Sequence, residues 1–431
     1  MNGARVAGAM LLAAALMMMG CPSTTSTGAP KPDGGAATAS APVGTYAFWP
    51  QAPDEPRIQF AKSFLTFDDV SKREVSGLEK IVFGREVENG ETISKPYGVA
   101  VRHGRIYVCD IRNRALTVLD LKAKQTRLVG VSGSVALRHP VAVAIGEDGS
   151  LYVADNELNS IVVFDPGERF SRAIGHDKFR PAGVAVHGNR LYATDMTSQL
   201  VEVFDTGTGQ RVGVIGSIGD EDGQFRLPLG VATDAKGDVY VVDMMRCKVQ
   251  KFTPEGKFLM SFGAQGDYIG AFVRPKHIAV DSEGIIYVVD AGFQNVQMFD
   301  TKGKTLMFFG SMGNHPGSMN LPAGIAVADD ELEVLGGLIH PGFKAKRMVV
   351  VSNQFGPNRI ALYAMGGVRE GYTAADLHKS AMKMVSGVST PSAERLQFQN
   401  PGALPPPPTE ATVTPKTAGP PEAPAGPVAP R

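Results

Sequence analysis

The chain has 431 residues, and its 43 Lys and Arg are matched by 43 Asp and Glu, so its formal net charge at pH 7 is zero. This balance excludes a globally basic nucleic-acid binder and a strongly acidic chain. The three cysteines, at positions 21, 109 and 247, are too few for a disulfide framework. The stability of the folded part must therefore come from the burial of apolar surface.

The first 20 residues predict a signal peptide. Arg5 is the only charged side chain ahead of an apolar run from Val6 to Met19. A run of about 14 residues is too short to span a bilayer, which takes about 20. The polar, small-residue tract that follows has no basic stop-transfer cluster.

Gly20 and Cys21 resemble the lipobox of bacterial lipoproteins, in which the cysteine is diacylated and becomes the mature N-terminus. The resemblance implies an exported protein that is held at a membrane by lipid. Pro22 stands where an aspartate would signal retention at the inner membrane of enteric bacteria. We therefore expect an outer-membrane lipoprotein on the periplasmic or surface side; the alternative is an ordinary cleavage site beside an incidental cysteine.

Residues 21–55 are rich in Ser, Thr, Gly, Pro and Ala, and this composition predicts a flexible linker. The next segment, residues 57–64, alternates apolar and polar side chains as a strand does. A capping box from Ser71 to Glu74 then predicts a short helix, with Val75 and Leu78 on one face.

A proline-led unit recurs six times at spacings of 44, 41, 47, 47 and 47 residues. Each copy reads as an apolar strand, a turn, a second strand that ends in aspartate, a third strand, and a fourth strand that ends near a glycine. The prolines are Pro96, Pro140, Pro181, Pro228, Pro275 and Pro322, and the aspartates are Asp110, Asp155, Asp195, Asp243 and Asp290. Four short strands per period of 40 to 50 residues are typical of a propeller blade. The sequence therefore predicts an all-β fold, a six-bladed β-propeller around an axial channel.

The units KPYGVAV, RPAGVAV and LPLGVAT, followed by RIYVCD, RLYATD and DVYVVD, resemble the NHL-repeat family. The resemblance covers residues 96–366 and implies a six-bladed propeller of NHL type. It implies no activity, because that family includes enzymes, RNA-binding modules and scaffolds. The sixth copy departs from the pattern: its second strand, RMVVVS, ends at Ser352 in place of aspartate, and an insertion lies near 329–346.

Closure of the ring requires the sixth blade to take its outermost strand from the N-terminal side. Residues 57–64 are our first candidate for this latch strand. Residues 78–84 are a rival, because Gly84 precedes Pro96 by 12 residues, the interval that separates Gly216 from Pro228. The pattern of the sequence leaves both candidates open.

After the ring, Thr373 and Asp376 form another capping box, which predicts one short C-terminal helix. The last 31 residues include 11 prolines and predict a disordered tail. The domain organisation expected is a signal peptide (1–20), a linker (21–55), a propeller (56–366), a helix with an extension (367–400), and a Pro-rich tail (401–431).

The residues that enter each first strand and follow each second strand share one face of a propeller, which is where ligands usually bind. Many of them are cationic or apolar: Lys95, His139, Arg180, Arg274, Lys276, His277, Arg112, Arg114, Arg246, Met244, Met245, Phe293 and Phe355. One interpretation is a docking surface for an anionic or Met-compatible partner. The other is a solvated rim whose charges are balanced by carboxylates in neighbouring loops, such as Asp220 and Asp267.

The repeated aspartates favour a structural use, because Asp bonds nearby backbone N–H groups in turns. A catalytic metal would need several ligands that converge from different first strands. His277 is the one such residue at the matching positions, and with His139 it is too sparse for a zinc site. We therefore expect no metal, no cofactor and no catalytic residue.

The hypothesis from sequence is a non-enzymatic binding or assembly scaffold at the cell envelope. Its expected partners are an unidentified envelope or extracellular protein and, through the lipid on Cys21, the membrane. Nucleic-acid binding is not expected. The alternative is a metal-dependent propeller enzyme of lyase or lactonase type with its site in the central channel.

Overall fold

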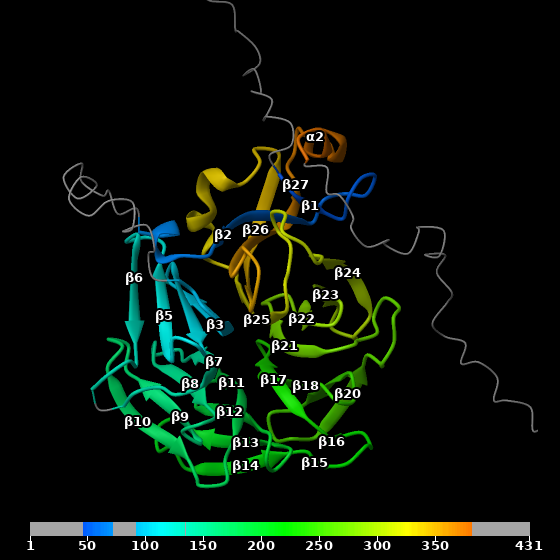
Figure 1. The fold of residues 1–431 in the computed structure, drawn as a ribbon. Coiled ribbons are helices and arrows are strands. Elements are labelled where there is room, and N and C mark those ends of the chain that lie inside the picture. The colour runs from blue at the N-terminus through cyan, green and yellow to red at the C-terminus, as the bar shows by residue number, and fades with distance from the viewer. Residues whose placement is uncertain (1–45, 72–91, 134, 382–431) are drawn as a thin grey trace, which may run out of the picture.

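The computed structural model describes residues 46–71, 92–133 and 135–381. Six antiparallel sheets stand around a central axis as the blades of a propeller (Figure 1). Each of the first five blades has four strands in chain order from the axis outward, and the sixth has five. The predicted fold class is confirmed.

The strands of the blades have the following bounds. Blade 1 contains β3 (Pro96–Arg102), β4 (Arg105–Asp110), β5 (Ala115–Asp120) and β6 (Gln125–Val129). Blade 2 contains β7 (Pro140–Ile145), β8 (Leu151–Asp155), β9 (Ser160–Phe164) and β10 (Phe170–Gly175). Blade 3 contains β11 (Pro181–His187), β12 (Arg190–Asp195), β13 (Leu200–Asp205) and β14 (Arg211–Ile215). The short parallel pair β15 (Ser217–Ile218) and β16 (Gln224–Phe225) leads into blade 4, which contains β17 (Pro228–Thr233), β18 (Val239–Asp243), β19 (Lys248–Phe252) and β20 (Phe258–Phe262). Blade 5 contains β21 (Pro275–Val280), β22 (Ile286–Asp290), β23 (Asn295–Phe299) and β24 (Thr305–Phe309). Blade 6 contains β25 (Pro322–Ala328), β26 (Phe343–Asn353), β27 (Ile360–Val368), β2 (Ile58–Phe64) and β1 (Phe48–Trp49).

The ring is closed. The inner strands β3, β7, β11, β17, β21 and β25 lie each beside the next, and β25 lies beside β3. Glycines allow this close approach: a Cβ added to Gly98 would lie 2.6 Å from the Cα of Ala142 on the next blade. A side chain larger than hydrogen does not fit at that distance, which explains the glycine two residues after the proline.

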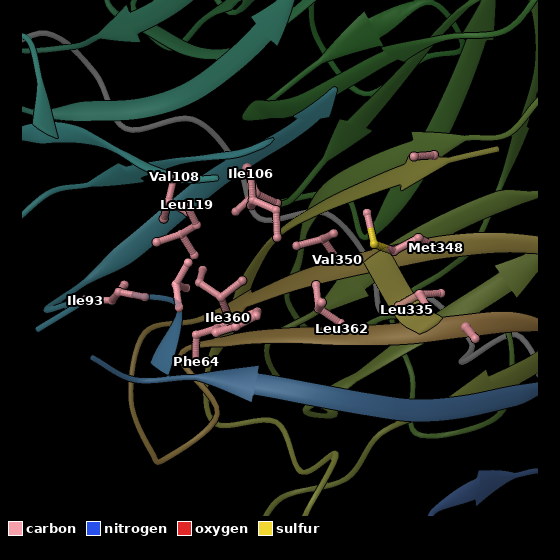
Figure 2. Close-up of a cluster of buried hydrophobic side chains, with 14 of the residues drawn as sticks. Phe64, Ile93, Ile106, Val108, Leu119, Leu335, Met348, Val350, Ile360 and Leu362 are labelled. Atoms are coloured by element: carbon pink, nitrogen blue, oxygen red, sulfur yellow. The ribbon is translucent and has the colours of Figure 1, made fainter. Parts of the chain in front are cut away.

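Six clusters of buried apolar side chains hold the ring together, and each cluster joins two neighbouring blades. Figure 2 shows the cluster between blades 6 and 1. There Ile106, Val108 and Leu119 of blade 1 face Met348, Val350 and Leu362 of blade 6, with Phe64, Ile93, Leu335 and Ile360 beside them. Burial of one such side chain contributes about 1.5–3 kcal/mol. Each blade therefore depends on both of its neighbours for the cover of its faces.

The latch strand is β2, which pairs antiparallel with β27 and places Ile58 opposite Met365. The prediction for residues 57–64 is confirmed. The rival segment 78–84, and the predicted helix beyond Ser71, lie outside the described residues. A 3-10 turn, η1 (Phe67–Asp69), follows the latch strand.

The ordered body begins further toward the N-terminus than the linker boundary at residue 55 predicted. Strand β1 pairs with β2 and becomes the fifth strand of blade 6. Phe48 and Trp49 are buried against this blade, so the entropy lost on ordering the segment is offset by burial. The linker prediction is therefore wrong for the residues from Tyr46 onward.

The C-terminal helix is confirmed as α2 (Ala374–Lys379), and both bonds of its predicted capping box with Thr373 are present. It lies beside the last blade in Figure 1, and its Leu377 is fully buried in the cluster of blades 6 and 1. The insertion of the sixth copy forms a 3-10 segment, η3 (Leu332–Leu338). No helix of the described residues is both long and apolar enough to cross a membrane.

Candidate functional site: the mouth of the axial channel

The six prolines and the repeated aspartates lie on the same face of the ring, because in blades 1 to 5 each proline stands opposite an aspartate in antiparallel register. Pro96 pairs with Asp110, and Pro275 pairs with Asp290. We call this the mouth face. The predicted rim residues adjoin these prolines and aspartates in the chain, so they belong to this face.

The repeated aspartates hold the turns of the mouth face. Asp155 accepts hydrogen bonds from the backbone N–H groups of Arg138 (2.7 Å), His139 (3.0 Å), Glu157 (3.1 Å) and Leu158 (3.1 Å). Equivalent bonds are accepted by Asp110, Asp195, Asp243 and Asp290. The carboxylates thus join the entry of the first strand to the exit of the second, and their structural use is confirmed.

In the sixth blade an asparagine takes the place of the aspartate that accepts backbone N–H groups in the other blades. Pro322 stands opposite Asn353, one residue later than the Ser352 that the sequence suggested as the counterpart of the aspartates. The Oδ1 atom of Asn353 accepts the backbone N–H of Asn320 at 3.2 Å, as the aspartates do in the other blades. Ser352 instead accepts the N–H of Gly324 at 2.9 Å and donates to the carbonyl of Tyr97, which ties blade 6 to blade 1. The assignment of Ser352 is therefore corrected.

Lys276 is the most unusual charged group of the mouth. Only 5% of its surface is exposed, and its Nζ lies 5.3 Å from the centre of the Tyr97 ring. That ring belongs to blade 1, whereas Lys276 belongs to blade 5. Burial, with the charges of Arg274 and Lys95, lowers the pKa of Lys276 to about 8. Among the described residues, no hydrogen bond or ion pair reaches this ammonium group.

Other predicted rim cations gather around the same point. Lys95 and Arg274 are near enough to Lys276 to act on its pKa. The pKa of His139 is lowered, chiefly by burial; the charges of Asp155 and Glu157 raise it, and those of Lys95 and Arg180 lower it. The cations Lys95, Arg180, Arg274 and Lys276 of blades 1, 3 and 5 therefore form one electropositive region, with His139 of blade 2 beside it.

A second part of the rim is balanced by its own loops. Arg226 pairs with Asp220, and Arg246 donates to the backbone carbonyls of Glu221 (3.0 Å) and Gln224 (2.7 Å). Arg246 therefore holds the loop ahead of blade 4 and is not available in the way that the sequence interpretation assumed. Here the interpretation as a solvated, balanced rim fits better.

Large apolar side chains are exposed on the mouth face beside these charges. Met245 exposes 67% and Phe355 54% of their surfaces, whereas Met244 and Phe293 are partly buried. The guanidinium of Arg359 lies 5.9 Å from the centre of the Phe355 ring. Further exposed members, which the sequence did not single out, are Ile218, Tyr268, Ile269, Val273 and Met312. Loops of several blades thus add apolar area next to the cationic region.

His277 lies in the wall of the channel, with 8% of its surface exposed. Burial lowers its pKa to about 4, so its imidazole is neutral at pH 7. Neither ring nitrogen has a hydrogen-bond partner among the residues that the structure describes. Within the same residues, no group of three or more His, Cys, Asp or Glu side chains is placed to hold a metal ion.

The sequence interpretation missed Tyr97. A signal was present, because Tyr97 and Lys276 occupy the same position in their repeats, directly after the proline, where the other copies have Val141, Ala182, Leu229 and Ala323. The contact between the two itself depends on the closed ring, which brings blades 1 and 5 to the same opening.

Comparisons with known proteins add the following. No family model matches the chain. Protein SUPPRESSOR OF QUENCHING 1, chloroplastic, from Arabidopsis thaliana is 24% identical over 179 residues, which cover 32% of this chain and 17% of that relative. The chain thus spans less than a fifth of that relative's length.

Among solved structures, a streptogramin B lyase has a TM-score of 0.46 and 13% identity, covering 66% of this chain and 85% of its own. A protein of unknown function from Bacteroides thetaiotaomicron VPI-5482 has a TM-score of 0.49 and 16% identity, covering 63% of this chain and 69% of its own. Such likeness concerns the fold alone. With six sheets, six clusters between them and a closed inner ring, the chain is a six-bladed β-propeller.

Proposed function

We propose that this protein is a non-enzymatic binding or assembly module of the NHL-repeat type. It is held at the cell envelope by a lipid on Cys21, and it presents the mouth face to a protein partner with an anionic surface. The observation that carries the proposal is the set of unbalanced cations on that face. Lys95, Arg112, Arg114, Arg180, Arg274 and Lys276 make no ion pair among the described residues.

A further feature supports docking. Exposed Met245 and Phe355 supply the apolar and aromatic area that interfaces are enriched in. Unpaired cations beside such area favour an anionic protein, because complementary charge steers association and selects the partner.

Reversal of charge on the mouth face tests the proposal. We expect Arg112→Glu, Arg114→Glu and Arg180→Glu together to reduce crosslinked capture of a partner from intact envelopes by about tenfold, since rim charges set association rates. The same capture should fall as salt is raised. The measurement is quantitative mass spectrometry of the crosslinked proteins.

The matched control reverses three exposed lysines in turns of the opposite face: Lys236, Lys257 and Lys302. Their substitution by Glu should leave the capture unchanged. Equal loss in both triple variants, or capture that is independent of salt, would contradict docking through the mouth face.

The anchor has its own test. Cys21→Ser should abolish incorporation of labelled palmitate and move the protein from the membrane to the soluble fraction, because the thiol that takes the diacylglycerol is gone. A membrane fraction that is unchanged in this variant would refute the lipid anchor, and it would leave the docking proposal intact.

A further inference from the structure

Lys276 presents a physical problem that the fold alone does not resolve. Burial of a charged group without a partner is costly, and buried ammonium groups normally pair with carboxylates. Here the charges that act on Lys276 are the cations of Arg274 and Lys95, and the nearby aromatic group is the ring of Tyr97. An aromatic face stabilises a lysine less than a carboxylate would in the same place. Among the described residues, no negative group is paired with this ammonium group.

The repeat position that Lys276 occupies is mostly apolar in the other blades. The residues that directly follow the six prolines are Tyr97, Val141, Ala182, Leu229, Lys276 and Ala323. Four of the six are aliphatic, and Val141 and Ala323 are buried. The next residue in the chain, His277, is also buried and unpartnered within the described residues. One buried cation in an aliphatic setting matches a ligand with one negative group on an apolar body.

We propose that the channel mouth is a binding site for a carboxylate with an apolar body, whose carboxylate pairs with Lys276 and whose apolar part lies against the aliphatic residues of the ring. A phosphate fits less well, because a doubly charged group needs several well-shielded donors, and of the neighbouring cations Lys95 is half-buried and Arg274 is exposed. The site lies on the face proposed for docking, and it deepens that proposal by naming a ligand class.

A small fluorinated probe tests this directly. The ¹⁹F signal of 5,5,5-trifluoropentanoate should shift and broaden on addition of the full-length protein, whereas that of 5,5,5-trifluoropentanol should not. Inorganic phosphate should fail to displace the bound carboxylate. If the alcohol binds equally, or if phosphate displaces the probe at a lower concentration than unlabelled pentanoate does, the assignment to a carboxylate is wrong.

The variant Lys276→Met keeps the apolar stem and removes the charge. It should weaken binding of the probe by about tenfold or more, as loss of a charged hydrogen bond does. In the absence of ligand it should melt at a higher temperature than the wild type, because an unpaired buried charge has been removed. The control Lys236→Met, at an exposed position, should change neither property. A lower melting temperature for Lys276→Met would instead assign the lysine a structural role.

The dependence of binding on pH provides a second measurement on the wild-type protein. The groups around Lys276 are Arg274, Lys95, Tyr97 and His277; the imidazole of His277 is already neutral at pH 7, and burial raises the pKa of Tyr97. Binding of the probe should therefore fall as pH rises through about 8, when the Lys276 ammonium loses its proton. Binding that is constant from about pH 7 to 10 would overturn the site. If the probe does not bind, the carboxylate site is wrong, and the docking proposal is still tested by the triple variants. If the triple variants show no specific loss of capture, the docking proposal is wrong, and the carboxylate site is still tested by the probe.

Discussion

Arg347→Met is expected to lower the free energy of unfolding by about 3–5 kcal/mol, the cost of leaving a buried charge without its partner. The Arg347 side chain is 4% exposed, and its Nε lies 3.2 Å from the fully buried carboxylate of Asp281. It also contacts Asp329, and Glu283 at 3.0 Å. The cluster joins the hairpin turn of blade 5 to strand β26 of blade 6, so its loss should loosen the closing interface. Chemical denaturation at pH 7 measures the effect.

The dependence on pH separates this mechanism from a simple loss of packing. Burial raises the pKa of Asp281, and the charge of Arg347 opposes this rise. Without Arg347 the folded-state pKa should rise further above the unfolded value, so the variant regains stability as the pH falls through that raised pKa. The difference in the free energy of unfolding between Arg347→Met and the wild type should therefore be smaller in mild acid than at pH 7.

The exposed ion pair of Arg169 with Asp165 provides the control, because the Arg169 side chain is 82% exposed. Such surface pairs contribute about 0–1 kcal/mol, and Arg169→Met should stay within that range. If Arg347→Met cost no more than this control, or if its cost were constant with pH, the charge cluster would not stabilise the ring.

Deletion of residues 57–64 is expected to lower the melting temperature by more than about 10 °C, which for a domain of this size corresponds to a loss of several kcal/mol. The deletion removes the latch strand β2, with its buried Ile58 and Phe64. Gln59 is lost as well; its amide donates to the carbonyl of Leu338 at 3.1 Å and accepts the N–H of His340 at 3.0 Å. Strand β27 would then expose an unpaired edge that favours aggregation.

A synthetic peptide of residues 46–66 tests whether the defect is one of pairing. Added in excess to the deleted protein, it should restore much of the lost thermal stability, because binding to the folded ring shifts the equilibrium toward that state. The control is Arg57→Ala, at an exposed side chain beside the strand, which should leave the melting temperature unchanged. Wild-type stability of the deleted protein would mean that β2 does not close the ring.

The repeat made the ring predictable, because the proline, the aspartate and the alternation of apolar residues recur with a regular period. The same regularity showed that the sixth copy lacked an outer strand of its own and had to take one from the N-terminal side, but it left residues 57–64 and 78–84 both open. Strand β1 escaped prediction because Phe48 and Trp49 are too few to show alternation. Asn353 was missed by one residue, because the long strand β26 carries no aspartate to mark its register.

Features of the site that depend on contacts between distant blades could not be predicted. The cationic residues of the mouth were found by position, but sequence spacing could not show that Lys276 is buried or that Tyr97 faces it. Likewise, Arg347 and Asp281 lie in different repeats, and their pairing follows from how blades 5 and 6 pack. Contacts between side chains of different blades depend on how the blades pack, and the spacing of the repeat does not predict them.

The order of events during synthesis follows from the place of β2 in the chain. The segment that seals the circle is made first, yet its partner β27, with Ile58 opposite Met365, emerges some 300 residues later. Until β27 has been synthesised, β2 has no native partner, and the nascent chain must avoid pairing β2 with the edge strands of other blades. A force applied at the N-terminal side of the folded protein would act on the pairing of β2 with β27 before it acts on blades 1 to 5.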